Sequence, residues 1–317
     1  MPSRNLLRAL ICPAALLFSL ALARAGDVTG ADGKNTVAAS GTNASSIQQA
    51  NQPNSHDIFY AQTMYTGMSN ISGLLARGRQ DATYNDLLYA HRFTIKGNWD
   101  VRLGMEYQRY DFTGDMAPLP DHLQNFNATI AIEYVVQDFP AVALELHPGF
   151  SYENNVTWKN FDIPMDAFTS VKLYKDKVFG IAGVEYDNFI WPSVSGFGGV
   201  IWLINDKTRL QAIMPRPALI YDPTDDWEFQ LHGQIYGGGF RLDQSGRTPV
   251  TYQGAIVRYT YDQVGVEATY KKWKPFNIIF DAGYNIQREF DFIHYGPDQK
   301  YTSSGAPYVG ITFTAYY

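Results

Sequence analysis

The chain has 317 residues, of which 25 are Lys or Arg and 31 are Asp or Glu, so its formal net charge is −6. A nucleic-acid partner needs a basic footprint, and this acidic balance excludes nucleic acid as an expected partner. Cys12 is the only cysteine, which leaves no pair for an internal disulfide and no cluster for a thiolate-bound metal.

Residues 1–25 predict a secretory signal peptide. Arg4 and Arg8 form a basic start, residues 9–22 form an apolar stretch, and Ala23-Arg24-Ala25 matches an A-x-A cleavage site. A membrane anchor is the alternative, but this apolar run is short for a bilayer helix of about 20 residues. Cleavage would remove the cysteine and three arginines, which leaves 22 basic against 31 acidic residues and a net charge of −9.

Residues 26–55 and 56–317 differ sharply in composition. The first segment consists almost entirely of small and polar residues, so we expect a flexible tether, with a folded plug as the less favoured alternative. The second segment contains no comparable linker, and we treat it as one domain. No stretch after residue 25 approaches the ~18 consecutive apolar residues of a membrane helix.

Period-2 alternation recurs along the whole second segment and predicts β-strands. In residues 126–134, large apolar side chains alternate with Asn127, Thr129, Ala131 and Glu133, and residues 276–284 repeat the pattern. A soluble β-sandwich would also alternate, with its apolar face inward. The inverted arrangement, with apolar side chains outward, is typical of a transmembrane barrel.

Three further features favour the barrel. The chain has 22 Tyr, 19 Phe and 6 Trp, many of them near predicted strand ends, which suits two interfacial girdles. Predicted short turns alternate with long polar loops, as expected for periplasmic turns and outer loops. The last residues, YVGITFTAYY, alternate to an aromatic carboxy-terminal residue, which resembles the assembly signal of bacterial outer-membrane barrels.

The second half of the chain resembles an uncharacterised family of bacterial outer-membrane β-barrel domains of unknown function. The resemblance rests on GGVIWLINDKTRLQAIMPRPALIYDPTDDWEF (198–229), GGGFRLD (237–243) and QREFDF (287–292), and it covers about residues 165–317. It implies an outer-membrane barrel, with outer-membrane lipid and the barrel assembly machinery as partners. It implies no catalytic residue, substrate or cofactor, and it leaves the oligomeric state unknown.

The fold class that we predict is all-β, a transmembrane antiparallel up-and-down β-barrel of 12–14 strands. Strands are predicted at 57–67, 84–96, 99–112, 124–136, 140–151, 162–174, 178–188, 193–204, 226–241, 257–272, 276–290 and 305–317. The count depends on residues 208–221: as the two limbs of a hairpin they give fourteen strands, and as one long strand they give thirteen, or twelve if 57–67 is not a strand. Each limb is shorter than the ~9–11 residues of a full crossing.

Pro215-Arg216-Pro217 interrupts this region, and proline is normally confined to the edges and bends of sheets. An unbroken strand would aim Arg216 at lipid, which costs ~2–4 kcal/mol at mid-bilayer. We therefore predict a bend in the wall, with Arg216 turned inward or placed at the interface. An inward Arg216 could meet Glu228 or another carboxylate, and its charge reversal should alter ion selectivity or assembly.

No catalytic motif is present. The sequence lacks G-x-S-x-G, H-E-x-x-H, a phosphate-binding loop and an EF-hand loop. An outer-membrane hydrolase would need a histidine beside an acid near the outer rim. His294 with Asp291 or Asp298, and His122 with Asp121, are the candidate pairs for that less favoured alternative. No metal or cofactor is predicted.

The remaining candidate residues are those that the alternation turns toward the barrel lumen. They are mainly carboxylates, which would favour cations or hydroxylated solutes over anions if the lumen is open. The alternative is a closed structural or adhesive barrel filled by internal ion pairs. The candidate lumen-lining residues are Arg102, Glu106, Glu133, Glu145, His147, Glu185, Arg216, Glu228, His232, Glu267, Asp281 and Glu289.

Overall fold

The computed structural model describes residues 57–73, 77–114, 119–135, 140–175, 177–190, 192–244, 252–293 and 300–317. The predicted signal peptide and the polar segment 26–55 lie outside these residues. Within the described ranges, no helix is long and apolar enough to cross a membrane.

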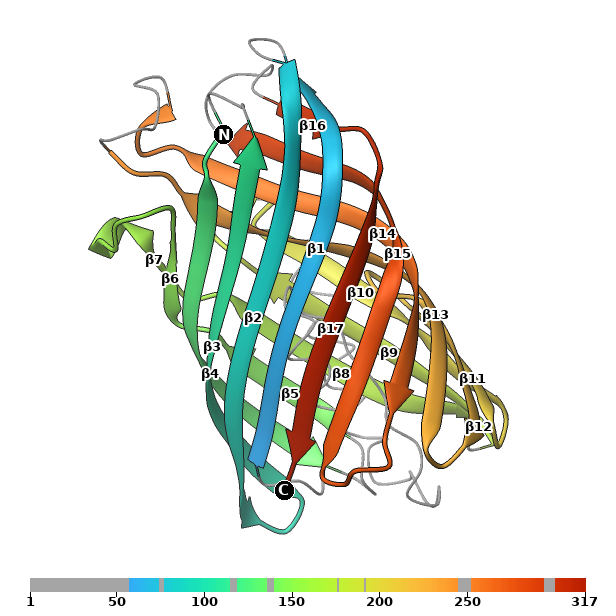
Figure 1. Ribbon diagram of the computed structural model, residues 1–317. Helices are drawn as coiled ribbons and strands as arrows, with labels where there is room; N and C mark the ends of the chain where they lie inside the picture. The colour runs from blue at the N-terminus through green and yellow to red at the C-terminus, as the bar shows by residue number, and fades with distance from the viewer. Residues whose placement is uncertain are drawn as a thin grey trace.

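The described residues form strand segments joined into one antiparallel sheet (Figure 1). The segments are β1 (Asp57–Gly73), β2 (Arg77–Lys96), β3 (Trp99–Gly114), β4 (His122–Val135), β5 (Pro140–Leu146), β6 (Gly149–Tyr152), β7 (Phe161–Asp162), β8 (Met165–Tyr174), β9 (Val178–Tyr186), β10 (Val194–Asn205), β11 (Thr208–Ile213), β12 (Ala218–Thr224), β13 (Trp227–Arg241), β14 (Ile256–Tyr270), β15 (Phe276–Ile293), β16 (Lys300–Ser303) and β17 (Ala306–Tyr316). A 3-10 turn, η2 (Trp158–Asn160), precedes β7.

The sheet closes on itself as a barrel of fourteen strands. β5 with β6, β7 with β8, and β16 with β17 are each one interrupted strand, because both members of each pair lie along the same neighbours. Closure occurs at β1, where Ile58 is opposite Ala90 of β2 and also opposite Tyr316 of β17. The predicted barrel is therefore confirmed at the upper end of the 12–14 range.

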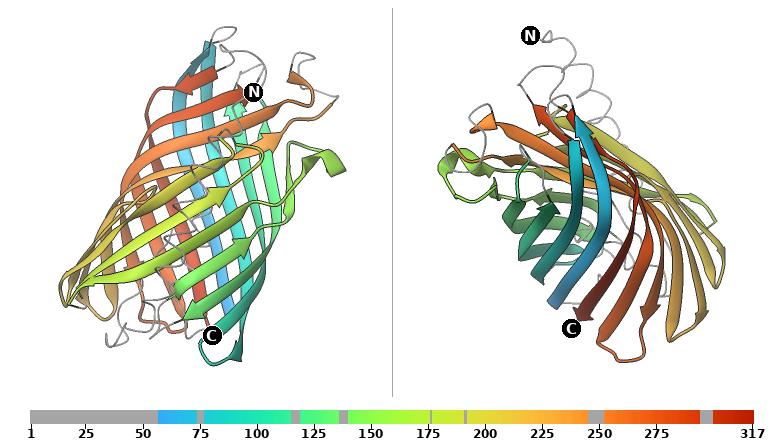
Figure 2. Two further views of the ribbon diagram at one scale, coloured as in Figure 1. Left: turned by 180° about the vertical axis from the view of Figure 1, so that it is seen from behind. Right: turned by 45° about the horizontal axis from the view of Figure 1, so that its top comes forward.

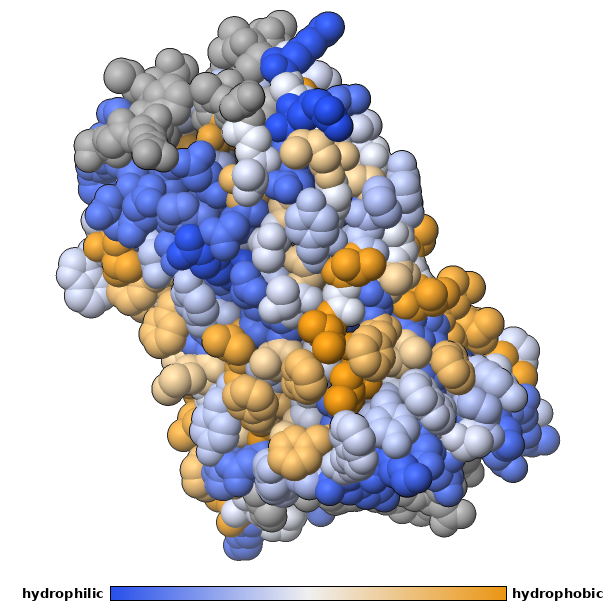
Figure 3. Space-filling model, viewed as in Figure 1, coloured by the Kyte–Doolittle hydropathy of each residue, from blue (hydrophilic) through white to orange (hydrophobic). Residues whose placement is uncertain are grey.

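The barrel wall carries large apolar side chains on its outer face, whereas its inner face carries both polar and aromatic side chains. Exposed large apolar side chains occupy alternate positions, as with Leu103 and Met105 of β3, while Arg102 and Glu106 on the opposite face are buried. Orange apolar residues gather in a belt between more polar ends in Figure 3. This inversion of a soluble sandwich confirms the transmembrane type of barrel.

The two ends of the barrel differ in their connections. Two-residue turns such as 97–98 and 206–207 lie at the end that carries the C-terminus, and longer connections such as 153–160 lie at the other end (Figure 1). We call these the short-turn end and the long-loop end. In barrels of this kind the short turns are periplasmic.

Residues 208–221 form a hairpin, with Pro215-Arg216-Pro217 in its connection. β11 has six residues and β12 has seven, and Gln211 opposite Ala218 is their last pair before the connection. The prolines therefore cap a short pair of strands rather than bending a long one. Because both limbs are short, the wall is lower here than at β13 to β15, as the view from behind shows (Figure 2).

Candidate functional site

A first cluster of buried ion pairs, near the short-turn end, is built around Arg102 of β3. Its guanidinium donates to Glu133 Oε1 at 3.0 Å and to Glu145 Oε1 at 2.5 Å. Arg92 of β2 lies 3.1 Å from the other oxygen of Glu133. His147 extends the cluster, since its Nε2 lies 3.6 Å from oxygens of Glu145 and of Asp166. All of these groups are buried, so each charge offsets the desolvation of its neighbour.

A second cluster lies halfway up the opposite wall and includes Arg216. Its guanidinium is ion-paired with Glu267 of β14. His232 Nε2 lies 3.2 Å from Asp281 Oδ1, and the hydroxyl of Tyr308 donates to the same oxygen at 3.0 Å. The inward turn of Arg216 thus follows the prediction, but its partner is Glu267 and not Glu228.

Glu228 belongs instead to a third cluster near the short turns. Its Oε2 lies 3.1 Å from Arg209 Nη2 of β11 and 2.6 Å from Lys271 Nζ. Both cations also contact Asp222, at 2.7 Å and 2.9 Å. These two partners are closer to Glu228 along the wall than Arg216 is, which explains the different pairing.

Three predicted residues lie apart from these clusters. Glu106 is buried and accepts a hydrogen bond from Gln108 Nε2 at 3.0 Å. Glu185 accepts one from the Ser195 hydroxyl at 3.3 Å. Glu289 was predicted to face inward, and this was wrong: it pairs with Arg258 at 3.6 Å and with Lys300 at 2.7 Å on the outer face.

The reason for the error at Glu289 is a β-bulge in β15. The pairing jumps from Gln263 opposite Asn285 to Asp262 opposite Gln287, which leaves Ile286 as an extra residue. An extra residue reverses the facing of everything after it. Arg288 is consequently buried inside, where it donates to the Ser69 hydroxyl at 2.5 Å and to Gln80 O at 2.6 Å.

The sequence prediction missed several inward cations that neutralise the acidic lining. They are Arg92, Arg209, Lys271 and Arg288. The first two were detectable, because Arg92 alternates with apolar residues of its strand and Arg209 with Leu210 and Ala212. Lys271 follows the last residue of β14 and Arg288 follows the bulge, so alternation carried no signal for either.

His232, Glu267 and Asp281 are the described group whose ligand atoms lie close enough together to hold a metal ion, all within 4.8 Å of one another. The guanidinium of Arg216 already contacts Glu267 and supplies the positive charge that such an acidic site requires. Arg216 is therefore the cation of this cluster, and the cluster has the chemistry of an ion pair.

An aromatic cluster lies in the interior toward the long-loop end. Tyr84 stacks on Tyr110 with ring centroids 4.7 Å apart, and Tyr236 stacks on Tyr261 at 5.3 Å. Further rings of the same buried cluster are Phe112, Phe240, Tyr259, Phe290, Phe292 and Tyr301. The interior is therefore aromatic at one end and charged at the other.

A gap interrupts the barrel wall above the short hairpin. Beyond His232, one edge of β13 is bonded to the hairpin connection instead of to a strand. The Gly233 N–H donates to Pro217 O, and the Ile235 N–H donates to Pro215 O. Its next strand pairing among the described residues is Arg241 with Tyr152 of β6. We define the side gap as the space bounded by residues 194–198 of β10, the connection 214–217, residues 233–241 of β13, and residues 187–190 and 192–193 between β9 and β10.

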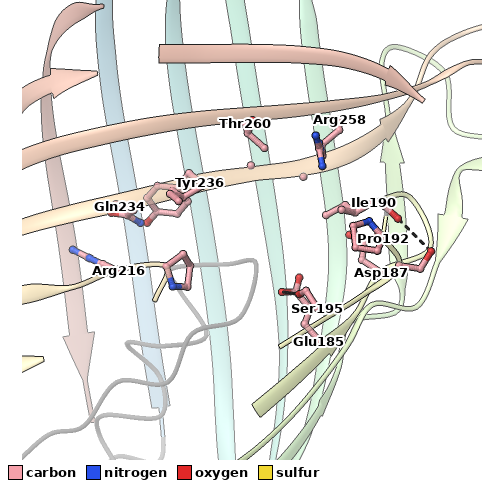
Figure 4. A pocket seen from close by; sticks show the side chains of 15 residues that line it. Glu185, Asp187, Ile190, Pro192, Ser195, Arg216, Gln234, Tyr236, Arg258 and Thr260 are labelled. Carbon is pink, nitrogen blue, oxygen red and sulfur yellow. Dashed lines mark hydrogen bonds between the residues drawn. The ribbon is translucent and has the colours of Figure 1, made fainter. Parts of the chain in front are cut away.

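A cavity of about 210 Å³ lies in the side gap (Figure 4). Gln234 and Tyr236 line it from β13, Arg216 from the hairpin connection, and Ile190 and Pro192 from the residues between β9 and β10. Gly237 and Gly238 carry no side chain that could fill it. A second, smaller cavity continues from Gly238 toward inward residues of β3 and β4.

Residues 187–190 and 192–193 cover part of the side gap. Phe189 is buried, and its backbone lies close to Gly239: a Cβ added to Gly239 would be 2.4 Å from Phe189 O. The Arg241 guanidinium lies 5.2 Å from the centroid of the Phe189 ring. Burial raises the pKa of Asp187 to about 7, and the neighbouring Asp162 and Glu185 carboxylates raise it too, against the lowering effect of the Phe189 N–H.

The residues considered for hydrolysis are not assembled into a catalytic site by the described part of the chain. His294 and Asp298 lie outside the described residues. Asp291 is ion-paired with Arg258 at 3.0 Å on the outer face. His122 begins β4 and Asp121 precedes it, where the Asp121 carbonyl accepts the Phe112 N–H.

No protein-family model matches the chain, and no curated protein matches its sequence. Among solved structures, an outer membrane channel from Pseudomonas putida F1 is similar at 10% identity with a TM-score of 0.46, over 83% of this chain and 96% of that one. The Pseudomonas putida toluene transporter TodX has 10% identity and a TM-score of 0.43, over 89% and 96%. The outer membrane protease OmpT from Escherichia coli has 9% identity and a TM-score of 0.29, over 84% and 97%.

Proposed function

We propose that this protein is an integral barrel of the bacterial outer membrane and a passive channel for small solutes. The observation that carries the proposal is the unsatisfied polarity of the interior. Neither amide atom of Asn285 has a hydrogen-bond partner among the described residues, and the same holds for Asn125 Oδ1, Gln263 Oε1 and Thr129 Oγ1, all buried. A sealed core pairs such atoms. Water or a hydroxylated solute in the lumen would supply the missing partners.

A closed structural barrel is the competing function, and the paired charges favour it. Arg102 with Glu133 and Glu145, and Arg216 with Glu267, are the internal ion pairs that a filled barrel would contain. A barrel of fourteen strands lies between filled barrels of about 8 strands and open channels of about 16. The number of strands therefore does not decide between the two functions.

Conductance of the purified full chain in planar lipid bilayers tests the proposal. We expect discrete conductance steps and a reversal potential that favours cations. Glu106→Gln, which neutralises an inward carboxylate, should reduce that preference, whereas Asp81→Asn on the outward face of β2 should leave it unchanged. A protein that keeps heat-modifiable gel mobility and shows no steps would establish the closed barrel instead.

A further inference from the structure

The side gap passes through the wall, from its outer face to its inner face. Ile235, Arg258 and Thr260 line its cavity from the outward side of β13 and β14. Gln234 and Tyr236 line the same cavity and are buried on the inward side. A cavity that contacts both faces of one strand extends around the free edge of that strand.

Exposed apolar side chains border the outer rim of the side gap on three sides. These are Val194 of β10, Met214 of the hairpin connection and Ile235 of β13, and all three are exposed on the outer surface. Residues of this kind in a transmembrane barrel face the hydrocarbon region of the bilayer. The side gap therefore opens toward lipid rather than toward water.

The inner end of the side gap meets the boundary between the two halves of the interior. Tyr236 lines the cavity and is also a member of the aromatic cluster, with its ring centroid 6.3 Å from that of Tyr84. Toward the short-turn end, a solute would instead meet the charged clusters of Arg102, Arg209 and their partners. An apolar solute among the aromatic residues would therefore lie next to the side gap. Along the barrel axis, it would instead have to pass the charged groups.

Four ionisable side chains line the side gap: Arg216, Arg258, Glu185 and Asp187. Glu185 accepts a hydrogen bond from the Ser195 hydroxyl at 3.3 Å, and burial favours the protonated form of Asp187. Arg216 binds Glu267, and Arg258 binds Asp291 at 3.0 Å. The neutral surface that remains is formed mainly by Ile190, Pro192, Pro215, Ile235 and the ring of Tyr236, with Gln234 and Ser195 as hydrogen-bonding groups. This lining suits an uncharged ligand with little polar surface.

We propose that the side gap is a lateral route by which small, uncharged, largely apolar molecules pass between the barrel interior and the hydrocarbon layer of the membrane. Transfer of apolar surface into hydrocarbon is favourable, whereas passage between the buried charges is not. This inference rests on the proposed channel function, and it adds a substrate class and a path.

Gly238 is the position at which the route can be closed. A Cβ at Gly238 would meet nothing nearer than the ring of Phe240 at 3.4 Å, and Gly238 lines the cavity of about 210 Å³. Gly238→Trp should fill the cavity. Ala282→Trp, which adds the same indole to an exposed position of β15 away from the side gap, is the matched control.

The experiment measures uptake of radiolabelled naphthalene by bacterial cells that carry the full-length protein in their outer membrane. We expect the wild type and Ala282→Trp to speed uptake over cells without the protein, and Gly238→Trp to abolish this gain while keeping the heat-modifiable gel mobility of a folded barrel. Equal uptake by Gly238→Trp and the wild type, or no protein-dependent uptake beside normal conductance, would overturn the lateral route alone. Absence of conductance in the wild type would overturn the channel itself.

A second variant covers failure of Gly238→Trp to assemble. Gly238→Cys can be folded first and then modified with N-phenylmaleimide, because Cys12 is the only other cysteine and lies in the predicted signal peptide. Uptake should be normal before modification and lost after it. Uptake that persists after complete modification would contradict the proposal.

Discussion

At the scale of single residues, Arg216 shows how a charge is kept in the wall of a membrane barrel. The side chains of Arg216 and Glu267 are only 13% and 11% exposed, so neither charge is well hydrated. Arg216→Glu would place a third carboxylate beside Glu267 and Asp281. We expect it to destabilise the barrel by about 3 kcal/mol, as for a broken buried ion pair.

The measurement is urea unfolding of the protein in lipid vesicles, followed by tryptophan fluorescence. The double variant Arg216→Glu with Glu267→Arg restores opposite charges and should recover most of the lost stability. A single variant as stable as the wild type would show that the pair has no structural role.

Asp187 provides a second prediction, on pH dependence. Its folded pKa of about 7 lies above the ordinary value of about 3.9 for an aspartate, so the protonated form is favoured in the folded state. The stability that this group contributes is fully present below about pH 4 and is lost as the pH rises through about 7. The groups that face it are Asp162 of β7 and Glu185 of β9, with Arg241 of β13 over the neighbouring Phe189.

Urea midpoints of the wild type and of Asp187→Asn at pH 5 and pH 8 check this prediction. The wild type should lose more stability than the variant between the two values, because the amide does not titrate. Equal losses would mean that the Asp187 carboxyl is hydrated in the folded protein.

The residue assignments show what alternation predicts and where it stops. Alternation predicted that Arg102, Glu133 and Glu145 point inward, and these residues are buried together in the barrel. It failed at Glu289, because one bulged residue reverses the facing and nothing local in the sequence marks the bulge. It also could not pair Arg216 with Glu267, since 51 residues separate them and their contact depends on how the strands close.

At the scale of elements, the packing of residues 187–190, the loop segment that follows β9, against β13 depends on the absence of a side chain at Gly239. A Cβ at Gly239 would lie 2.4 Å from Phe189 O and 2.5 Å from Phe189 Cβ. Gly239→Ala should therefore displace the loop from the side gap. We expect chymotrypsin to cleave after Phe189 about tenfold faster than in the wild type, which corresponds to ~1.4 kcal/mol of local opening.

Gly238→Ala is the neighbouring control, because its Cβ has an ordinary contact at 3.4 Å with the Phe240 ring. It should leave the cleavage rate unchanged. A cleavage rate in Gly239→Ala that matches this control would show that the loop accommodates the methyl group and is not held at Gly239.

The element boundaries near Pro215-Arg216-Pro217 could be predicted only as alternatives. Turn parity favoured a hairpin, whereas the length needed to cross a bilayer favoured one strand. The structure keeps the hairpin and accepts its shortness by leaving the wall incomplete above it. The period-2 alternation and the turn residues identify strands well. They carry no information on whether neighbouring strands extend equally far along the barrel wall.

At the scale of the whole molecule, the apolar belt determines where the barrel is located. Substitutions at two valines distinguish insertion of the belt into a membrane from simple exposure to solvent. Val266 of β14 is 57% exposed within the belt, and Val156 is 55% exposed in the long connection that follows β6. Arginine at Val266 should cost ~2–4 kcal/mol in lipid vesicles if the belt faces hydrocarbon, whereas arginine at Val156 should cost almost nothing. Because the two side chains are equally accessible, solvent exposure alone predicts equal effects. Unfolding of both variants in vesicles distinguishes the cases, and equal stabilities would mean that this barrel does not place Val266 in a bilayer.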